Sequence, residues 1–231
     1  AAAGSLVYGL SPFVLGHITG QSALLLPFVA LPWLVWCVRN ALRGDAWKWT
    51  AIAALITTTA GALNGSSIFF VLAGVVLWIP FAVWWERSTT LRAGLGVLGR
   101  LALLVLASQL WWLVAYQVGG KYGQPILNIT ETVNQTSSTT SALEVFRGLG
   151  YWFFYGGDHQ GPWLSGLAPA FTQNLVLLTV SFAAPALCLL LGWWARARER
   201  AYFGLLVVVG TLASTIAFGG ADRSPAGRLF E

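Results

Sequence analysis

The sequence predicts an all-α fold, a polytopic bundle of transmembrane helices with one long loop that carries a short interfacial helix. Hydrophobic residues make up 57% of the 231 residues and charged residues only 9%, whereas charged residues form about a quarter of a soluble domain. Several apolar runs approach the roughly 20 residues that a membrane-crossing helix needs. Lysine and arginine cluster in some of the segments between these runs and are scarce in others.

Proline, glycine and polar residues mark where the apolar runs end. Residues 1–11 are predicted to be the end of a helix, because Ser11-Pro12 breaks the run and a short polar stretch follows. Later prolines lie inside a run, which membrane helices tolerate where neighbours satisfy the freed carbonyl groups. Asn64-Gly65 is a turn signal that divides one overlong run into two helices. We expect one partial and six complete spans, at about residues 1–11 (partial), 22–38, 49–63, 67–85, 95–118, 172–194 and 201–218.

The segments between the spans differ in charge. Alternate threading gives one side of the membrane nine basic and three acidic residues, a net charge of +6, and the other side four basic and five acidic residues, a net charge of −1. An excess of lysine and arginine marks the cytoplasmic side. Residues 119–171, the one long segment between spans, are therefore predicted to form an extracytoplasmic loop. We expect a multi-pass protein of the cytoplasmic membrane whose active face is extracytoplasmic.

The basic segments have two interpretations. They can serve only to fix the topology, or they can in addition bind anionic membrane lipid or an acidic cytosolic protein, such as an acyl carrier protein. The sequence leaves both open. We expect no nucleic-acid partner, because the net charge of +5 is concentrated in segments that flank the membrane.

The predicted loop has a polar half and an aromatic half. Residues 121–140 show neither a helical nor a strand period and are expected to be irregular. Ser141 and Glu144 then fit a capping box, in which each side chain accepts a hydrogen bond from the other residue's backbone amide. The apolar positions that follow, as far as Phe153 and with Arg147 among them, predict a short helix in the membrane interface.

Candidate site residues gather in and near this loop. The aromatic side chains either form an interfacial belt or line a wall for substrate, for which the candidates are Tyr122, Trp152, Tyr155 and Trp163. Asp158-His159, flanked by glycines that let a backbone approach a ligand closely, is either a hydrogen-bonded turn or a ligand contact. His17 is predicted to lie at the same extracytoplasmic level, where it is a structural residue or lines the ligand.

Several chemistries can be set aside. The sequence has no phosphate-cradling Gly-x-x-x-x-Gly-Lys loop, no metal cluster of His and Cys, and no nucleophile elbow. No cofactor is identifiable, and a divalent metal is compatible with the sequence but not indicated by it. Cys37 and Cys188 lie in apolar spans and are expected to be inert thiols. The near absence of charge within the spans argues against ion-coupled transport by this segment.

Two groups of residues carry a resemblance to a known family. The apolar span that surfaces at Leu10-Ser11-Pro12-Phe13-Val14-Leu15-Gly16, followed by a helix hairpin that turns at Asn64-Gly65, resembles the GT-C polytopic glycosyltransferases. The later stretches are similar to the large actinobacterial α-(1→3)-arabinofuranosyltransferases of cell-wall arabinan synthesis; they are Asn128-Ile129-Thr130-Glu131-Thr132, Ser137-Ser138 and Arg147 to Asp158.

The resemblance implies a lipid-linked donor, decaprenyl-phospho-arabinose, and transfer of arabinofuranose to an arabinan acceptor outside the cytoplasmic membrane. In GT-C enzymes the catalytic carboxylate follows the first transmembrane helix. The sequence has no methionine and opens inside an apolar run, so we expect a piece of a longer protein that begins after that carboxylate, and the catalytic residues stay unknown. Candidates for binding the donor phosphate or the acceptor are His17, Lys121, Arg147, Asp158 and His159. Lys121, Arg147 and His159 are the candidate positive partners of the leaving phosphate.

Two other classes of protein stay open. One is a transporter or flippase of a lipid-linked substrate, which inverted repeats in the full protein would favour; this sequence shows none. The other is a non-catalytic membrane subunit. An acidic residue directly after the first span, on the outer side, would favour the transferase.

Overall fold

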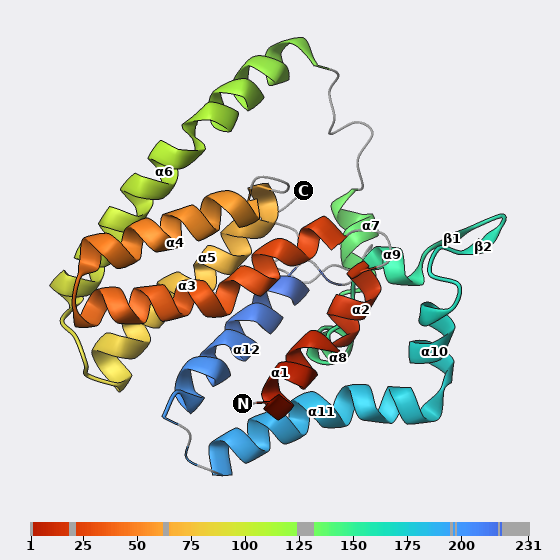
Figure 1. Ribbon diagram of the computed structural model, residues 1–231. Helices are drawn as coiled ribbons and strands as arrows, with labels where there is room; N and C mark the ends of the chain where they lie inside the picture. The colour runs from red at the N-terminus through yellow and green to blue at the C-terminus, as the bar shows by residue number, and fades with distance from the viewer. Residues whose placement is uncertain are drawn as a thin grey trace. The chain divides into compact units, whose positions relative to one another are not determined.

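The computed structural model describes residues 2–18, 22–61, 65–123, 132–194, 196, 198–216 and 218. These residues are mostly helical, which confirms the predicted fold class. The chain divides into two compact units, one formed by Ala1–Gly20 and Ile129–Glu231 and the other by Gln21–Asn128. Figure 1 labels the elements of both units.

The unit Gln21–Asn128 is a group of four helices. After a short 3₁₀ turn, α3 (Leu25–Arg43) packs against both α4 (Ala46–Gly61) and α5 (Gly65–Pro80), and α4 packs against α6 (Leu91–Tyr122). Leu34, Cys37 and Val75 are fully buried in this unit. The elements are η1 (Ser22–Leu24), α3 (Leu25–Arg43), α4 (Ala46–Gly61), α5 (Gly65–Pro80), the π-helical turn η2 (Phe81–Trp85) and α6 (Leu91–Tyr122).

Hydroxyl groups inside this unit bond to helix backbone. The buried Thr57 hydroxyl donates to the Ala53 carbonyl at 2.8 Å. Thr58 donates to the Ser108 hydroxyl at 2.7 Å, a bond that joins α4 to α6. Polar groups at membrane depth must be satisfied within the protein, because the hydrocarbon offers no partner. Serine and threonine can meet this demand and still allow helices to approach closely.

A proline shapes the link from α5 to α6. Pro80 has no amide hydrogen to continue the α-helical ladder, and the backbone widens into η2, where the Glu86 amide donates to the Phe81 carbonyl at 2.9 Å. The chain reverses at Arg87, whose φ of 52° is left-handed. Thr90 then caps α6 by accepting a hydrogen bond from the Ala93 amide at 3.3 Å.

The second unit combines helices with the described part of the predicted loop. Phe154, Leu164, Ala168 and Phe171 form its hydrophobic cluster, which Leu15 and Leu177 also contact. The elements are α1 (Ala2–Gly9), α2 (Pro12–Ile18), α7 (Val133–Ser137), α8 (Ala142–Phe146), α9 (Trp152–Tyr155), β1 (Gly157–Asp158), β2 (Gly161–Pro162), α10 (Leu167–Gln173), α11 (Leu175–Trp194) and α12 (Arg200–Thr215). The two short strands pair antiparallel, with Gly157 opposite Pro162 and Asp158 opposite Gly161.

Three helical segments of the described chain are long and apolar enough to cross a membrane: Ser22–Arg43, Leu91–Tyr122 and Leu175–Trp194. They cover three of the six predicted complete spans. Two shorter apolar helices, Val71–Trp85 and Arg200–Thr215, coincide with two more. The remaining span corresponds to α4, and Asn64 at its predicted end lies outside the described residues.

The helix ends differ from the predicted loop boundaries. α6 continues to Tyr122, past the predicted end at Val118, because Gly119 and Gly120 do not interrupt its hydrogen bonding. On the other side of the loop, α10 occupies Leu167–Gln173 and α11 begins at Leu175. Asn174 separates these helices and caps α11, its Oδ1 accepting from the amides of Val176 at 3.0 Å and Leu177 at 3.2 Å.

We expect Gly94→Val to lower the free energy of unfolding by about 1–3 kcal/mol. A Cβ atom at Gly94 would lie 2.6 Å from Ile79 Cγ2 on α5, and that β-branched side chain has few rotamers into which it can retreat. The measurement is thermal unfolding of the full-length protein in detergent. Gly99→Val on the same helix is the matched control, because its Cβ meets nothing within 4 Å. Equal melting temperatures for the two variants would contradict this packing of α5 on α6.

Candidate functional site

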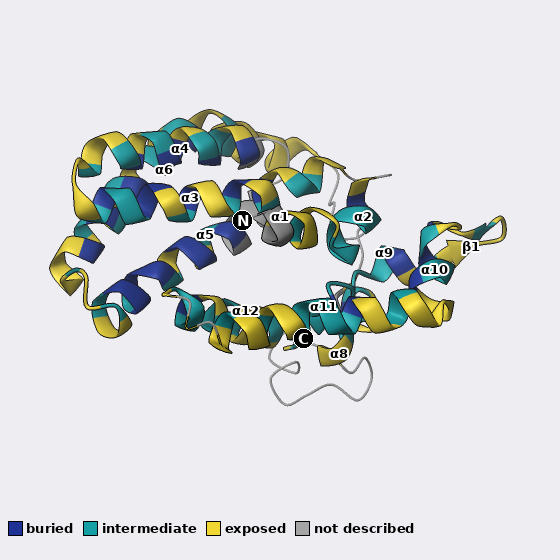
Figure 2. Ribbon diagram, turned by 60° about the horizontal axis from the view of Figure 1, so that its bottom comes forward, coloured by how far each residue is buried: buried dark blue, intermediate teal, exposed yellow. Residues whose placement is uncertain are grey.

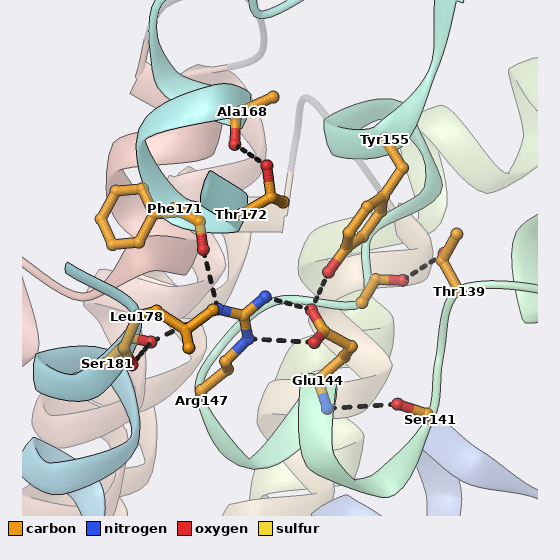
Figure 3. Close-up of polar contacts among 11 residues, drawn as sticks. Thr139, Ser141, Glu144, Arg147, Tyr155, Ala168, Phe171, Thr172, Leu178 and Ser181 are labelled. Atoms are coloured by element: carbon orange, nitrogen blue, oxygen red, sulfur yellow. Dashed lines mark hydrogen bonds and ion pairs between the residues drawn. The ribbon is translucent and has the colours of Figure 1, made fainter. Parts of the chain in front are cut away.

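A buried arginine lies at the centre of the polar contacts between α8 and α11. Arg147 ends α8 and is only 4% exposed. Its Nε and Nη2 donate to the two carboxylate oxygens of Glu144 at 3.1 and 2.8 Å, and its Nη1 donates to the Phe171 carbonyl at 2.9 Å. Figure 3 shows the guanidinium between these two acceptors. Such two-bond pairs are among the strongest hydrogen-bonded contacts in proteins.

Arg147 connects three helices. Its guanidinium carbon lies 5.4 Å from the centroid of the Phe182 ring, and its Nη1 reaches the Ser181 hydroxyl at 3.5 Å, both on α11. With Glu144 on α8 and Phe171 on α10, the side chain joins α8, α10 and α11. Arg147 is one of the predicted partners of a leaving phosphate. In this arrangement its donors are directed to groups of the protein itself.

Tyr155 completes this network from α9. Its hydroxyl donates a hydrogen bond to Glu144 Oε2. Burial raises the pKa of Tyr155, and the hydrogen bond and negative charge of Glu144 raise it further. The phenol therefore stays protonated and acts as a donor. Tyr155 is a predicted substrate-lining residue. The residue is 37% exposed, and its hydroxyl is hydrogen-bonded to the Glu144 carboxylate.

The local sequence explains why α8 is short. Ser141 Oγ accepts from the Glu144 amide at 3.3 Å, which confirms this half of the predicted capping box. The Glu144 carboxylate turns to Arg147 and Tyr155. Gly148 and Gly150 then take φ values of 77° and 98°, a left-handed conformation that glycine adopts at little cost. The helix expected to continue to Phe153 is thus two helices, α8 and α9, with a glycine turn between them.

His17 is buried against the same turn. It is 4% exposed, its Nδ1 lies 2.8 Å from the Phe13 carbonyl oxygen, and its ring centroid lies 4.7 Å from that of Tyr151. The adjoining cavity, lined by Gly16 and Gly148 among others, has a volume of about 10 Å³, room for no more than one water molecule. Burial lowers the pKa of His17, and the Phe13 hydrogen bond opposes this shift.

Asp158 and His159 lie in the turn of the β1–β2 hairpin. Asp158 Oδ1 accepts from the Gln160 amide at 2.8 Å, which is the hydrogen-bonded turn that the sequence left open as one interpretation. Asp158, His159 and Gln160 are all exposed. Figures 1 and 2 both show the hairpin extending away from α9 and α10. His159 and His17 therefore differ fully in burial.

Aromatic rings pack at the base of the hairpin. The Trp163 ring stacks on Phe153 with centroids 4.9 Å apart and an interplanar angle of 24°. Trp152 meets Trp163 edge to face at 5.3 Å. Trp163 stays 38% exposed. Two of the predicted substrate-lining residues, Trp152 and Trp163, are thus brought together, while Tyr155 faces the Glu144 carboxylate.

Lys121 and Tyr122 belong to the other unit, at the end of α6. Both are exposed, Tyr122 at 87%. Within the described part of the chain, no carboxylate forms an ion pair with Lys121. The same residues contain no group of three His, Cys, Asp or Glu side chains that could hold a metal ion.

The network contains groups that the sequence-based prediction omits. Glu144 is expected there only as a helix cap, although its spacing of three residues from Arg147 is a signal for an ion pair on one helix face. Phe153 supports Trp163 and carries no distinguishing signal within its aromatic run. The Phe171 carbonyl and Ser181 lie 24 and 34 residues from Arg147, and no local pattern connects them to it.

Comparison with known proteins gives consistent results. Residues 1–230 match the family described as α-(1→3)-arabinofuranosyltransferase, N-terminal GT-C domain. An α-(1→3)-arabinofuranosyltransferase of Mycobacterium tuberculosis is 29% identical over 215 residues, 91% of this chain. One of Mycolicibacterium smegmatis is 28% identical over 228 residues, 96% of this chain. The chain spans 15% of the length of each of these relatives. No solved structure matches it.

We expect Arg147→Ala to lower the free energy of unfolding by about 3–5 kcal/mol, because it leaves the Glu144 carboxylate and the Phe171 carbonyl without their donor. The measurement is thermal unfolding of the full-length protein, together with limited proteolysis between α8 and α10. Lys121→Ala is the control, since it removes an exposed cation. Unchanged stability in Arg147→Ala would show that the network does not hold these helices together.

We expect the contact between α2 and the glycine turn to weaken in acid. The pKa of His17 is lower in the folded protein than its ordinary value of 6.5, so the unfolded chain takes up a proton first. The stabilisation is complete above pH 6.5 and is lost as the pH falls through the folded-state pKa. Melting temperatures measured between pH 8 and pH 5 should fall less in His17→Gln than in the parent protein. His159→Gln, at an exposed position, should follow the parent; if His17→Gln does so as well, the assignment is wrong.

Proposed function

This chain belongs to the family of N-terminal GT-C domains of α-(1→3)-arabinofuranosyltransferases, and we propose that it is part of a membrane glycosyltransferase that transfers arabinofuranose from a polyprenyl-phosphate donor to cell-wall arabinan. The observation that carries this proposal is the family match over residues 1–230. The activity named for the mycobacterial relatives belongs to proteins of which this chain covers 15%. The donor, acceptor and membrane face proposed for it therefore need a direct test.

The apolar helix surfaces support a lipid-linked donor. α11 buries little of its own surface, and Leu187, Leu190 and Leu191 are more than half exposed. In a bilayer these side chains face acyl chains. A donor with a polyprenyl tail can reach such a protein laterally through the membrane, with its phosphate at the interface. The charge distribution of the segments between the spans supports a reaction on the extracytoplasmic side, where residues 119–171 are predicted to lie.

The reaction needs a base and a positive group. A carboxylate takes the proton of the acceptor hydroxyl while the oxygen of that hydroxyl forms a bond to C1 of the arabinose. The bond between C1 and the phosphate oxygen breaks at the same time, and its electron pair leaves with the polyprenyl phosphate. We assign no residue of this chain as the base. The chain would supply positive charge that stabilises the departing phosphate.

Lys121 has the strongest physical case among the three candidate cations. It is exposed at the end of a long apolar helix, where an ammonium group can reach a phosphate at the membrane surface. Arg147 would have to release Glu144 before it could bind an anion. His159 is exposed but follows Asp158 directly, and a neighbouring carboxylate repels a phosphate.

We expect Lys121→Ala to lower arabinose transfer by roughly 10-fold or more, on the scale of removing one donor to a developing negative charge. Transfer is measured with the full-length protein in membranes, a radiolabelled polyprenyl-phosphate arabinose donor and an arabinan oligosaccharide acceptor. Lys121→Arg should recover part of the rate, because the charge returns.

The matched control is Lys48→Ala, an exposed lysine on the predicted cytoplasmic side. The phosphate assignment fails if Lys121→Ala, His159→Ala and Arg147→Lys all transfer at the parent rate. Absence of transfer by the parent protein from any arabinose donor, in the presence of an intact fold, would instead favour a flippase, a transporter or a non-catalytic subunit.

A further inference from the structure

We infer that the β1–β2 hairpin and the exposed part of Trp163 at its base bind the acceptor, which we take to be a neutral, polyhydroxylated sugar chain. The inference rests on the proposed function and goes beyond it by assigning one ligand to one surface. The hairpin and its base comprise Gly156 to Trp163, which connect α9 to the segment that leads into α10.

The Trp163 ring is held in one orientation. The Phe153 ring stacks on it with centroids 4.9 Å apart, and the Trp152 ring meets it at an interplanar angle of 86°, so two neighbouring rings hold its orientation. The Trp163 amide also donates to the Gly156 carbonyl at 3.1 Å, directly below the strand pair. A ring that is supported in this way and still 38% exposed offers a preorganised apolar surface, which binds at a lower entropic cost than a mobile side chain.

Gly156 is what allows this position of the ring. A Cβ atom at residue 156 would overlap Cζ3 and Cε3 of the Trp163 ring. Both atoms belong to a rigid ring that stacks on Phe153, so a side chain at residue 156 would force the indole to move and would disturb this stack. The glycine therefore permits direct contact between backbone and indole, and any side chain at this position would displace Trp163.

Polar groups stand beside this ring at the hairpin turn. Asp158 uses Oδ1 to fix the turn through the Gln160 amide, and the side chains of His159 and Gln160 are exposed. Carboxylate, imidazole and amide groups can each bond to hydroxyl groups. Gly161, with a φ of 124°, closes the turn in a conformation that L side chains rarely adopt.

The charge of this surface favours a neutral sugar chain over a phosphate group or a polyprenyl tail as its ligand. Residues 148–166 contain one carboxylate and no lysine or arginine. The preceding Arg147 is bound to Glu144. A phosphate would meet the Asp158 carboxylate and no lysine or arginine of this segment. A polyprenyl tail would leave the polar groups of the turn without hydrogen-bond partners. A neutral sugar chain fits both the apolar ring and the polar turn, because its C–H groups can cover the indole while its hydroxyl groups bond to the side chains of the turn.

Kinetics of the full-length protein test this assignment. With a polyprenyl-phosphate arabinose donor and an arabinofuranose oligosaccharide acceptor, we expect Gly156→Ala and Trp163→Ala each to raise the acceptor KM by about 5- to 10-fold, the scale of one lost aromatic contact. The donor KM should stay unchanged. Trp163→Phe should recover part of the loss. Gly166→Ala, where a Cβ meets nothing within 4 Å, is the matched control and should behave as the parent.

Two further measurements keep the outcomes separate. His159→Ala and Gln160→Ala change exposed turn residues and leave the ring stack in place, so they test the surface even if Gly156→Ala does not fold. Direct titration of the oligosaccharide into the full-length protein, followed by tryptophan fluorescence, tests binding without transfer.

Oligosaccharide binding that is lost in Trp163→Ala would support the proposed surface even if no transfer were found. Such an outcome would count against the proposed function alone. An unchanged acceptor KM and unchanged oligosaccharide binding in both Trp163→Ala and His159→Ala would overturn the inference, as would a raised donor KM alone.

Discussion

The pairing of Arg147 with Glu144 is the interaction on which the unit containing the loop depends. A buried guanidinium needs both a counter-charge and hydrogen-bond acceptors for its remaining hydrogens. Different helices supply these groups. Glu144 supplies the charge from α8, the Phe171 carbonyl supplies an acceptor from α10, and Phe182 provides a ring face on α11. Because Tyr155 binds the same carboxylate, the start of the hairpin is also placed by this one ion pair.

Three glycines determine the path of the chain after the Arg147–Glu144 ion pair. Gly148 and Gly150 reverse the chain after Arg147 with positive φ values, so that α9 packs its Phe154 into the hydrophobic cluster. Gly156 then lets the indole of Trp163 lie on the backbone. Each glycine is needed for a different reason, a turn in two cases and a close approach in the third. A change at any of them would move the hairpin relative to the ion pair that anchors the unit.

Sequence and structure agree best where the physical signal is local or averages over many residues. Apolar run length predicted the membrane class, and the Ser141 cap was visible in a four-residue pattern. The division of the 142–153 segment into two helices was missed, because apolar spacing alone does not show that Gly148 and Gly150 adopt left-handed conformations. The surroundings of Arg147 were beyond prediction for another reason. Its partners on α10 and α11 are brought to it by tertiary packing. From the sequence, only its charge is known, and that charge makes Arg147 a candidate partner of the leaving phosphate.

The length of α6 can be compared with the thickness of a lipid bilayer. Arg100, which lies over the Trp47 ring at 5.4 Å, and Lys121 bound a stretch without a single charge. At 1.5 Å per residue this stretch measures about 31 Å, close to the roughly 30 Å thickness of the hydrocarbon layer. In a helix that follows the membrane normal, the two charged side chains would fall near its two boundaries. The first turns of α6 would then extend beyond the acyl chains, and the close contact of Gly94 with Ile79 would lie at the level of the lipid headgroups.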